Sequence, residues 1–513
     1  MTTVEQLQFT DAFVRALPGD PRSDNHTRQV RQACYSRVEP TPVPAPELLV
    51  LVPEVAALLG LEAPARDAGA LVEVLAGNRV VPGMAPYAAC YGGHQFGTWA
   101  GQLGDGRAIT LGEVTHAGQT WELQLKGAGP TPYSRTADGR AVLRSSLREL
   151  VCSEAMFHLG VPTTRALSLV ITGQPVLRDL LYDGHPAHEP GAVVCRVAPS
   201  FLRFGSFELH AARDDHATLR TLVDYTRATW FPGKTVAEMF AEVAHRTAWL
   251  LSEWMRVGFV HGVMNTDNMS ILGLTIDYGP YGWLEPFDLA WTPNITDAAN
   301  RRYRFGNQPA IAHWNLAQLA KALAPVCENP GEQARLRAAV DAFPREFSSL
   351  YRHTMLRKLG LAGRGDTIVE DDGLLAELAE LMQSIEVDFT LWFRRLAEPE
   401  RLPEAIYGEV TPLHRAMIAR WLERYRARVA VEGLSEAERA ARICEVNPIY
   451  VPRNYLLQEV IAATERGDRA ELLVLLDVLR APYRERPGLE RYAQPRPEWA
   501  RAKPGCSMLS CSS

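Results

Sequence analysis

Two neighbouring stretches of the chain alternate between apolar and polar side chains, as a β-strand does when one of its faces is buried. Residues 108–114 form the first stretch. In residues 121–126, three apolar side chains alternate with Glu122, Gln124 and Lys126. We therefore expect Lys126 to point away from the apolar layer, at the end of a strand and just before a glycine-containing turn.

The apolar pattern then takes a helical period from residue 140 to 158 and stops at Gly160-Val-Pro, a common helix ending. Glu149 lies on a weakly polar face of this helix, among small side chains. Because a strand lysine followed by a helix glutamate recurs in nucleotide-phosphate sites, we expect Glu149 to pair with Lys126. A solvated glutamate on the helix surface is the alternative.

Two further strands are predicted at residues 167–172 and 192–198. Arg196 lies within the second of them, and Arg203 follows seven residues later, framed by two phenylalanines. A guanidinium group is costly to bury unpaired, so both arginines are expected to hold an anion. A structural ion pair is the alternative.

Helical patterns dominate the rest of the chain, so the sequence predicts an α+β protein. We divide it into an N-terminal extension (1–88), a small β-rich lobe (89–205), a larger helical lobe (206–480) and a flexible tail (481–513).

Composition excludes several classes of protein. The 513 residues are 47% hydrophobic, with a net charge of −6 and a pI near 6.2, so we expect a globular protein without a nucleic-acid partner. The N-terminus lacks a signal-peptide pattern, and no apolar run is long enough to span a bilayer. We expect a soluble, cytoplasmic monomer that does not associate with membranes.

The eight cysteines lack the close pairs of a zinc site, and most are expected to be reduced and buried. Cys506 and Cys511 are the exceptions, because a polar chain end should expose them. An inert free thiol is the alternative for both.

The densest group of polar residues lies between His261 and Asp277. Asn268 and Asp277 flank a short apolar stretch, which could pair as a hairpin and bring two oxygen ligands to one hard cation such as Mg²⁺. Ordinary turn formation by Asp267, Asn268 and Asp277 is the alternative.

A glycine-rich segment covers residues 91–107 and contains six glycines. Such backbone next to a strand can approach a phosphate closely and offer its amides. Gly104, Gly106 and Arg107 are the members we expect to do so, although the segment does not match the Walker pattern.

Taken in chain order, these features resemble a protein kinase. A glycine-rich turn, a strand lysine, a helix glutamate, a loop from His261 to Asn268 and an Asp-Tyr-Gly at residues 277–279 follow one another. The kinase loop reads His-Arg-Asp, then four residues, then Asn. Here Val263 occupies the position of the kinase catalytic aspartate, so a kinase mechanism lacks its base.

Longer motifs point to one family. Tyr-Gly-Gly-His-Gln-Phe-Gly, Gly-Gln-Leu-Gly-Asp-Gly-Arg, Lys-Gly-Ala-Gly-x-Thr-Pro-Tyr-Ser-Arg and His-Gly-Val-Met-Asn-Thr-Asp-Asn-Met-Ser resemble the selenoprotein O family of pseudokinase-fold protein adenylyltransferases. The resemblance is dense from Tyr91 to Leu323 and thinner beyond, where Cys511 matches the family's terminal selenocysteine or cysteine. It implies a bilobal, protein-kinase-like fold.

The resemblance also implies a reaction, in which AMP is transferred from an inverted ATP to Ser, Thr or Tyr hydroxyls of proteins, with Mg²⁺ or Mn²⁺ and with UTP as a further donor to consider. It implies that Asp267 accepts a proton, that Glu149 pairs with Lys126, and that Asn268 and Asp277 hold the metal. It assigns nucleotide binding to Gly104, Gly106, Arg107, Lys126, Asp138, Gly139, Arg196, Arg203 and Asp277.

One departure from the family concerns the terminal thiol. Family members can pair it with a cysteine after Asp-Tyr-Gly, but residues 289–297 contain none and include Pro293. This argues against such a redox lock and leaves a Cys506–Cys511 disulfide as the alternative.

Two other functions remain open from the sequence. The first is a phosphotransferase of kinase fold. The second is a non-catalytic nucleotide-binding protein whose function resides in the C-terminal thiol.

Overall fold

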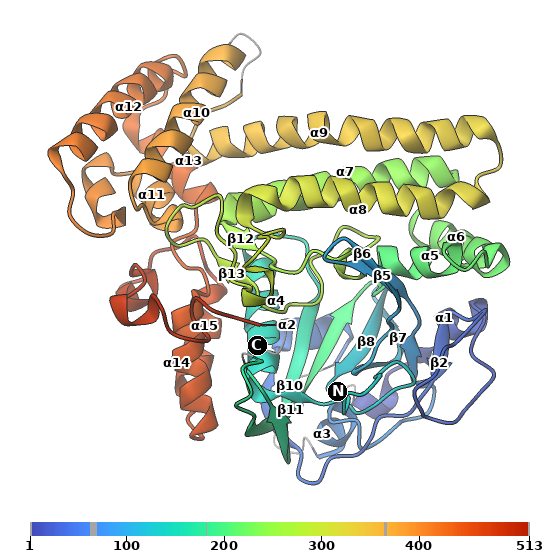
Figure 1. Ribbon diagram of the computed structural model, residues 1–513. Coiled ribbons are helices and arrows are strands. Elements are labelled where there is room, and N and C mark those ends of the chain that lie inside the picture. Colours follow the sequence, from blue (N-terminus) through green and yellow to red (C-terminus); the bar gives the residue numbers. More distant parts are fainter. Residues whose placement is uncertain (1–2, 62–68, 181, 364–366, 511–513) are drawn as a thin grey trace.

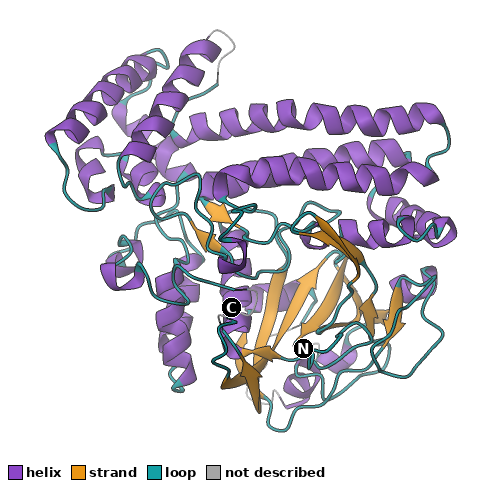
Figure 2. Cartoon of the chain, viewed as in Figure 1, coloured by secondary structure: helices purple, strands orange, loops and turns teal. Residues whose placement is uncertain are grey.

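The computed structural model describes residues 3–61, 69–180, 182–363 and 367–510, which form a β-rich lobe and a larger helical lobe (Figures 1 and 2). The first lobe is built on a nine-stranded sheet in which all neighbouring strands are antiparallel. Its main path runs β2 (Tyr35–Arg37), β4 (Tyr87–Ala89), β7 (Ala108–His116), β8 (Gln119–Lys126), β11 (Ala187–Ala198), β10 (Arg165–Arg178) and β3 (Glu47–Leu51). Off this path, β1 (Phe9–Thr10) pairs with β7, and β9 (Ala141–Val142) pairs with β11.

The alternating patterns of the sequence correspond to central strands of this sheet. β8 lies between β7 and β11, so Lys126 stands opposite both Ala108 and Val194. Helix α4 (Leu143–His158) packs against β10 and β11, and its apolar stripe is fully buried. The predicted strands and the predicted helix are therefore confirmed, although β10 and β11 are longer than the periodicity indicated.

The segment predicted as an N-terminal extension contributes strands to the sheet. β1, β2, β3 and the first part of β4 all lie within residues 1–88, and α1 (Ala12–Ala16), α2 (Pro53–Leu58) and α3 (Gly69–Leu75) belong to it as well. Its apolar side chains, including Phe13, Val50 and Val55, are buried in the same core as the rest of the lobe. Burial of these side chains explains why the segment is integral to the lobe.

The helical lobe is organised around three long helices that lie side by side in Figure 1. They are α7 (Val236–Val257), α8 (Gln308–Leu323) and α9 (Pro330–Lys358). The other helices of this lobe are α5 (Phe204–Ala211), α6 (His216–Trp230), α10 (Ile368–Ser384), α11 (Phe389–Arg395), α12 (Pro412–Ala430), α13 (Glu436–Val446), α14 (Asn454–Glu465) and α15 (Ala470–Leu479). Among the described helices, none is both long and apolar enough to cross a membrane.

Helix α7 shows how local sequence sets an element's ends. The Thr235 hydroxyl and the Glu238 carboxylate cap its first turn reciprocally, and Gly258 ends it in a left-handed conformation at φ 73°. The strand that follows, β12 (Phe259–Val260), pairs with β13 (Gly282–Trp283) and so brackets the polar loop between them.

The described part of the C-terminal tail packs against the helical lobe. The Leu509 amide donates to the Pro293 carbonyl (3.0 Å), and the Ile295 amide donates to the Leu509 carbonyl (2.8 Å). Cys506 is only 3% exposed, and burial raises the pKa of its thiol to about 11. The expectation of an exposed Cys506 in a loose tail is therefore wrong, because neighbouring chain covers it; Cys511 lies outside the described residues.

Candidate active site

The predicted lysine–glutamate pair is present in the sheet lobe. Lys126 Nζ lies 2.5 Å from Glu149 Oε2, and the two residues are only 8% and 2% exposed. Burial lowers the pKa of Lys126, and the adjacent Glu149 carboxylate opposes that shift. The contact predicted from the order of strand lysine and helix glutamate is confirmed.

The two predicted arginines meet at the same place. Arg196 donates to Glu149 (3.1 Å) and to Asp277 (2.5 Å), while Arg203 donates to the other oxygen of Asp277. Arg203 also donates to the backbone carbonyl of Asp267 at 2.8 Å. Both arginines thus make the internal ion pairs that the sequence left open as an alternative, and their role towards a nucleotide stays a prediction.

Asp277 forms ion pairs with Arg196 of β11 and with Arg203, the residue just before α5. It has a left-handed backbone conformation (φ 54°), which a short polar side chain tolerates better than most. Burial alone would raise the pKa of its carboxyl. Instead, Arg203, Arg196 and Lys126 hold that pKa well below its usual range, so Asp277 is ionised at neutral pH.

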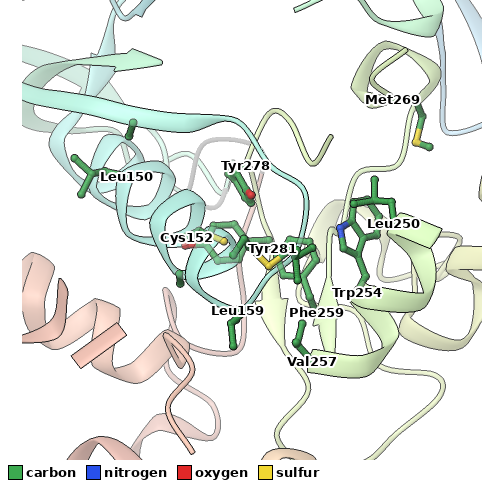
Figure 3. Packing of buried hydrophobic residues seen from close by; sticks show 14 of the residues in the cluster. Leu150, Cys152, Leu159, Leu250, Trp254, Val257, Phe259, Met269, Tyr278 and Tyr281 are labelled. Carbon is green, nitrogen blue, oxygen red and sulfur yellow. The ribbon is translucent and has the colours of Figure 1, made fainter. Parts of the chain in front are cut away.

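The aromatic core beneath this site comes from both lobes. Figure 3 shows Tyr278 and Tyr281 lying between Cys152 of α4 and Phe259 of β12. The rings of Phe259 and Tyr281 are 5.8 Å apart, and Arg148 of α4 lies 4.3 Å over the Tyr281 ring. The chain just after Asp277 is therefore fixed by packing on both sides.

The loop from His261 to Asp277 does not pair with itself as a hairpin. Ser270 forms a bridge with Arg203, and Thr275 forms one with Thr163. The stretch between Asn268 and Asp277 thus pairs with outside segments through Ser270 and Thr275, which is the physical reason that the hairpin expectation is wrong.

Asp267 lies in the middle of this loop, on a short 3₁₀ turn from Thr266 to Asn268. It is 7% exposed, and among the described residues its Oδ1 has no hydrogen-bond partner. The Gln95 amide donates to its Oδ2 at 3.3 Å. Burial raises the pKa of Asp267 to about 7, a value that suits a proton acceptor working near neutral pH.

The glycine-rich segment ends beside Lys126. The Gly127 amide donates to the Arg107 carbonyl at 2.7 Å. Gly104 has φ 88°, and a Cβ placed on it would lie 2.4 Å from the Tyr133 ring. A Cβ placed on Gly106 would likewise lie 3.0 Å from the Tyr133 carbonyl oxygen. Only glycine permits this tight approach of backbone segments.

The turn at Asp138 and Gly139 lies at the same end of the sheet. The Gly129 amide donates to the Gly139 carbonyl at 3.1 Å, and a Cβ on Gly139 would lie 2.1 Å from the Gly129 carbonyl carbon. The Asp138 carboxylate accepts hydrogen bonds from Arg178 at 2.7 and 2.9 Å. Arg107 thus lies beside the end of β8, while Gly139 packs against Gly129 of the turn that follows Lys126.

Sequence reasoning missed two polar residues of this cluster. Gln124 accepts a hydrogen bond from Arg196, and its amide donates to Asp105 at 3.2 Å. Asp105 is buried 4.0 Å from Arg203. Gln124 shares the polar face of its strand with Lys126, and this alternation was the signal available for it. Asp105 lies within the Gly-Gln-Leu-Gly-Asp-Gly-Arg motif, which was the signal available for it.

The chemistry of the loop residues fits a hard divalent cation. The Asn268 amide nitrogen donates to the Val263 carbonyl at 2.8 Å, which turns its oxygen away from that backbone. Asn268 and Asp277 would together supply oxygen ligands only, as Mg²⁺ and Mn²⁺ prefer. No group of three or more His, Cys, Asp or Glu suited to a metal occurs in the part of the chain described, so the remaining ligands would come from phosphate and water.

The site combines fixed positive charge with an unpaired carboxylate oxygen. Three buried cations (Lys126, Arg196 and Arg203) are balanced by carboxylates, and Asp267 offers a free oxygen nearby. The order of strand lysine, helix glutamate, polar loop and Asp-Tyr-Gly is that of the bilobal, kinase-like α+β fold predicted from the sequence.

Known proteins match the chain along nearly its whole length. The model of one family, described as protein adenylyltransferase SelO, matches residues 22–480. A protein nucleotidyltransferase YdiU from Aromatoleum aromaticum is 56% identical over 530 residues, covering 99% of this chain and 100% of that relative. Another YdiU, from Tolumonas auensis, is 55% identical over 522 residues, covering 99% of both chains.

Among solved structures, a chain described as ROP2 from Toxoplasma gondii, a virulence factor with a protein-kinase fold and no enzymatic activity, is 13% identical. It covers 57% of this chain and 87% of its own length. The TM-score is 0.24, which is too low to support an argument about this chain. The family match and the identities above 50% do show to which family the chain belongs. The chain belongs to the family of protein adenylyltransferase SelO and is a nucleotidyltransferase.

Proposed function

We propose that this protein transfers AMP from ATP to serine, threonine or tyrosine hydroxyls of other proteins, with Mg²⁺ or Mn²⁺ bound at Asn268 and Asp277. Nucleotidyl transfer onto proteins follows from family membership. AMP as the transferred group, the inverted nucleotide and the roles of individual residues are our proposal.

The observation that carries the proposal is the convergence of Lys126, Arg196 and Arg203 next to Asp277. Arg196 and Arg203 each donate to one oxygen of Asp277, and Lys126 lowers the pKa of the same carboxyl. Because these cations are buried and held by carboxylates, they are oriented before any nucleotide arrives. A triphosphate needs such fixed positive charge, above all on the pyrophosphate that leaves.

The proposed step is a displacement at the α-phosphorus of ATP. The acceptor hydroxyl oxygen forms the new bond to phosphorus, Asp267 takes the hydroxyl proton, and the bond to the bridging oxygen breaks to release pyrophosphate. Lys126, Arg196 and Arg203 neutralise the charge that develops on the leaving group. A divalent cation, when bound, adds Lewis-acid stabilisation to the same phosphates.

The position of the free aspartate favours AMP transfer over a kinase reaction. Val263 stands at the kinase base position, whereas Asp267 lies four residues later and next to the predicted metal ligand Asn268. Because the base is displaced in this way, the proposal requires the nucleotide to present its α-phosphate, and not its γ-phosphate, to Asp267.

ATP labelled on either the α- or the γ-phosphate tests the reaction directly. We expect the α-label alone to remain on protein, with a gain of one AMP in intact mass, and UTP is run as a second donor. Asp267→Asn is expected to lower transfer by roughly 10²–10⁴-fold, the usual contribution of a general base. Retention of the γ-label would show phosphoryl transfer and reject the proposal.

A further inference from the structure

A small hairpin of the sheet lobe is attached directly to the loop that carries Asp267. β5 (Gly92–Gln95) and β6 (Thr98–Gln102) form a separate two-stranded sheet, seen at the top of the sheet lobe in Figure 1. The His94 amide donates to the Thr266 hydroxyl at 2.7 Å, and the Gln95 side chain donates to Asp267 at 3.3 Å.

The next residue of the hairpin continues this contact. The Phe96 amide donates to the Asn265 side chain at 3.2 Å and to the Tyr303 hydroxyl at 3.0 Å. Three consecutive hairpin residues thus bind three consecutive loop residues that are 169–172 positions away in the chain. The hairpin tip therefore has a fixed position relative to the proposed base.

The hairpin backbone also packs closely against the unpaired oxygen of Asp267. A Cβ on Gly93 would lie 2.7 Å from Asp267 Oδ1, an oxygen that is itself buried, so only glycine fits against it. The acceptor hydroxyl must reach this oxygen for the proposed step. The hairpin is therefore next to the atom that the acceptor must reach.

The tip presents aromatic side chains to solvent. Phe96 and Trp99 are 38% and 36% exposed, a large fraction for residues of this size. The Phe96 ring lies 5.3 Å from that of Tyr303, and the Trp99 ring lies 5.1 Å from that of His94. Exposed aromatic rings next to a proposed catalytic group are typical of a surface that binds a peptide chain.

A cluster of arginines borders the same tip. Arg301, Arg302 and Arg304 occur within four residues, and the guanidinium carbon of Arg302 would lie 3.2 Å from a Cβ on Gly97. The same carbon lies 4.9 Å over the Trp314 ring. Arg302 therefore lies at the tip, and Arg301 and Arg304 are its close neighbours in the chain.

Acidic residues balance this cluster only in part. Residues 289–307 contain three arginines and one acidic residue, Asp297. Asp297 is buried, and its carboxylate accepts hydrogen bonds from the backbone amides of Arg302 and Tyr303. Residues 289–307 thus carry more positive than negative charge, on a protein whose net charge is −6.

We propose that the β5–β6 tip (residues 96–99) and residues 301–304 form the docking surface for the acceptor protein, and that they select hydroxyl residues flanked by aspartate or glutamate. The inference rests on the proposed function, since it names the substrate class of that site. Charge complementarity carries it, because the arginines attract an acidic segment and the aromatic rings offer it apolar contact. The overall negative charge disfavours a nucleic acid as the occupant.

Matched peptides test the selection. Two fluorescent peptides share one serine and differ only in flanking glutamate or glutamine; binding is followed by anisotropy and transfer by mass. We expect the acidic peptide to bind about tenfold more tightly and to have a correspondingly lower KM. This preference should largely disappear near 1 M salt, where the screening length is only about 3 Å.

Charge reversal locates the surface. Arg301→Glu with Arg304→Glu should raise the KM of the acidic peptide about tenfold and leave the neutral peptide almost unchanged. Arg301→Gln with Arg304→Gln should give a smaller change of the same kind. The matched control is Arg420→Glu with Arg426→Glu, on two exposed positions of α12, which should change neither peptide.

The outcomes separate this inference from the proposed function. Equal binding of the two peptides, or equal effects of the 301/304 and 420/426 reversals, would overturn the acidic docking surface. Displacement of the acidic peptide by a single-stranded RNA at lower concentration would also overturn it, in favour of a nucleic acid. Absence of any AMP mass gain on peptide or protein would instead reject the proposed function.

Discussion

Glu149 holds two buried cations at once, so its neutralisation is the most informative single change in the site. Its carboxylate lies 2.5 Å from Lys126 Nζ and 3.1 Å from Arg196. Glu149→Gln keeps the size of the side chain and one acceptor oxygen but removes the charge. Lys126 and Arg196 are then left with less compensation in a buried environment.

The expected cost follows from burial. Removing one partner of a buried ion pair costs roughly 3–5 kcal/mol, because the remaining charge stays desolvated. At roughly 2 °C per kcal/mol for a large domain, the melting temperature should fall by about 6–10 °C. Loss of the carboxylate also lets burial lower the pKa of Lys126 further, so nucleotide affinity and transfer should both fall.

A matched variant separates stability from function. Glu154 lies on the same helix, is likewise buried, and accepts hydrogen bonds from Arg165 at 2.7 and 2.5 Å. It is about 140° around the helix from Glu149 and points away from the site. Glu154→Gln should therefore lose comparable stability but keep nucleotide binding and transfer.

The assay measures thermal unfolding with and without ATP and metal, together with transfer of α-labelled AMP. We expect Glu149→Gln to lose most of the ATP-induced rise in melting temperature, and Glu154→Gln to keep it. If both variants lose transfer to the same extent, or if Glu149→Gln retains it fully, the pair with Lys126 is structural and our reasoning fails.

Other predictions are independent of that pair. Gly139→Ala should lower ATP affinity measured by calorimetry, because its Cβ would lie 2.1 Å from the Gly129 carbonyl carbon. Glu122 is buried, and burial raises its pKa to about 8 from a usual 4.5, so the folded protein should lose up to about 5 kcal/mol of stability as pH rises through that window. Urea titrations at pH 6 and 9 check this, and Glu122→Gln should flatten the dependence. Asp277→Ala should abolish AMP transfer measured by intact mass, whereas Cys511→Ser should leave basal transfer largely intact.

Local patterns in the sequence determined the elements of the site. Alternation places Lys126 at the end of a strand, and helical periodicity places Glu149 on the face of α4 that meets it. Both patterns depend on neighbours within a few residues, so they can be recognised in the sequence without a structure. The motifs around residues 104–107 and 261–277 identified the family for the same reason.

The tertiary structure determines the ionisation states of these residues and the partners that orient their side chains. Asp277 is kept ionised by Arg203 and Arg196, which lie 74 and 81 residues before it in the chain. Asp267 has its pKa raised to about 7 by burial that no pattern in its own loop reveals. Desolvation and ion pairing depend on chain segments brought together only by folding.

The same distinction explains the placement of the two chain ends. Proline-rich and polar composition suggested an extension before residue 89 and a loose tail after residue 480, yet both segments bury apolar side chains against the lobes. The hairpin that contacts Asp267 lies 172 residues from it in sequence. Sequence alone determined the family and predicted most residues of the cluster, among them Lys126, Glu149 and Asp277. Only the folded chain decided their partners, because contacts between distant segments leave no local periodicity to detect.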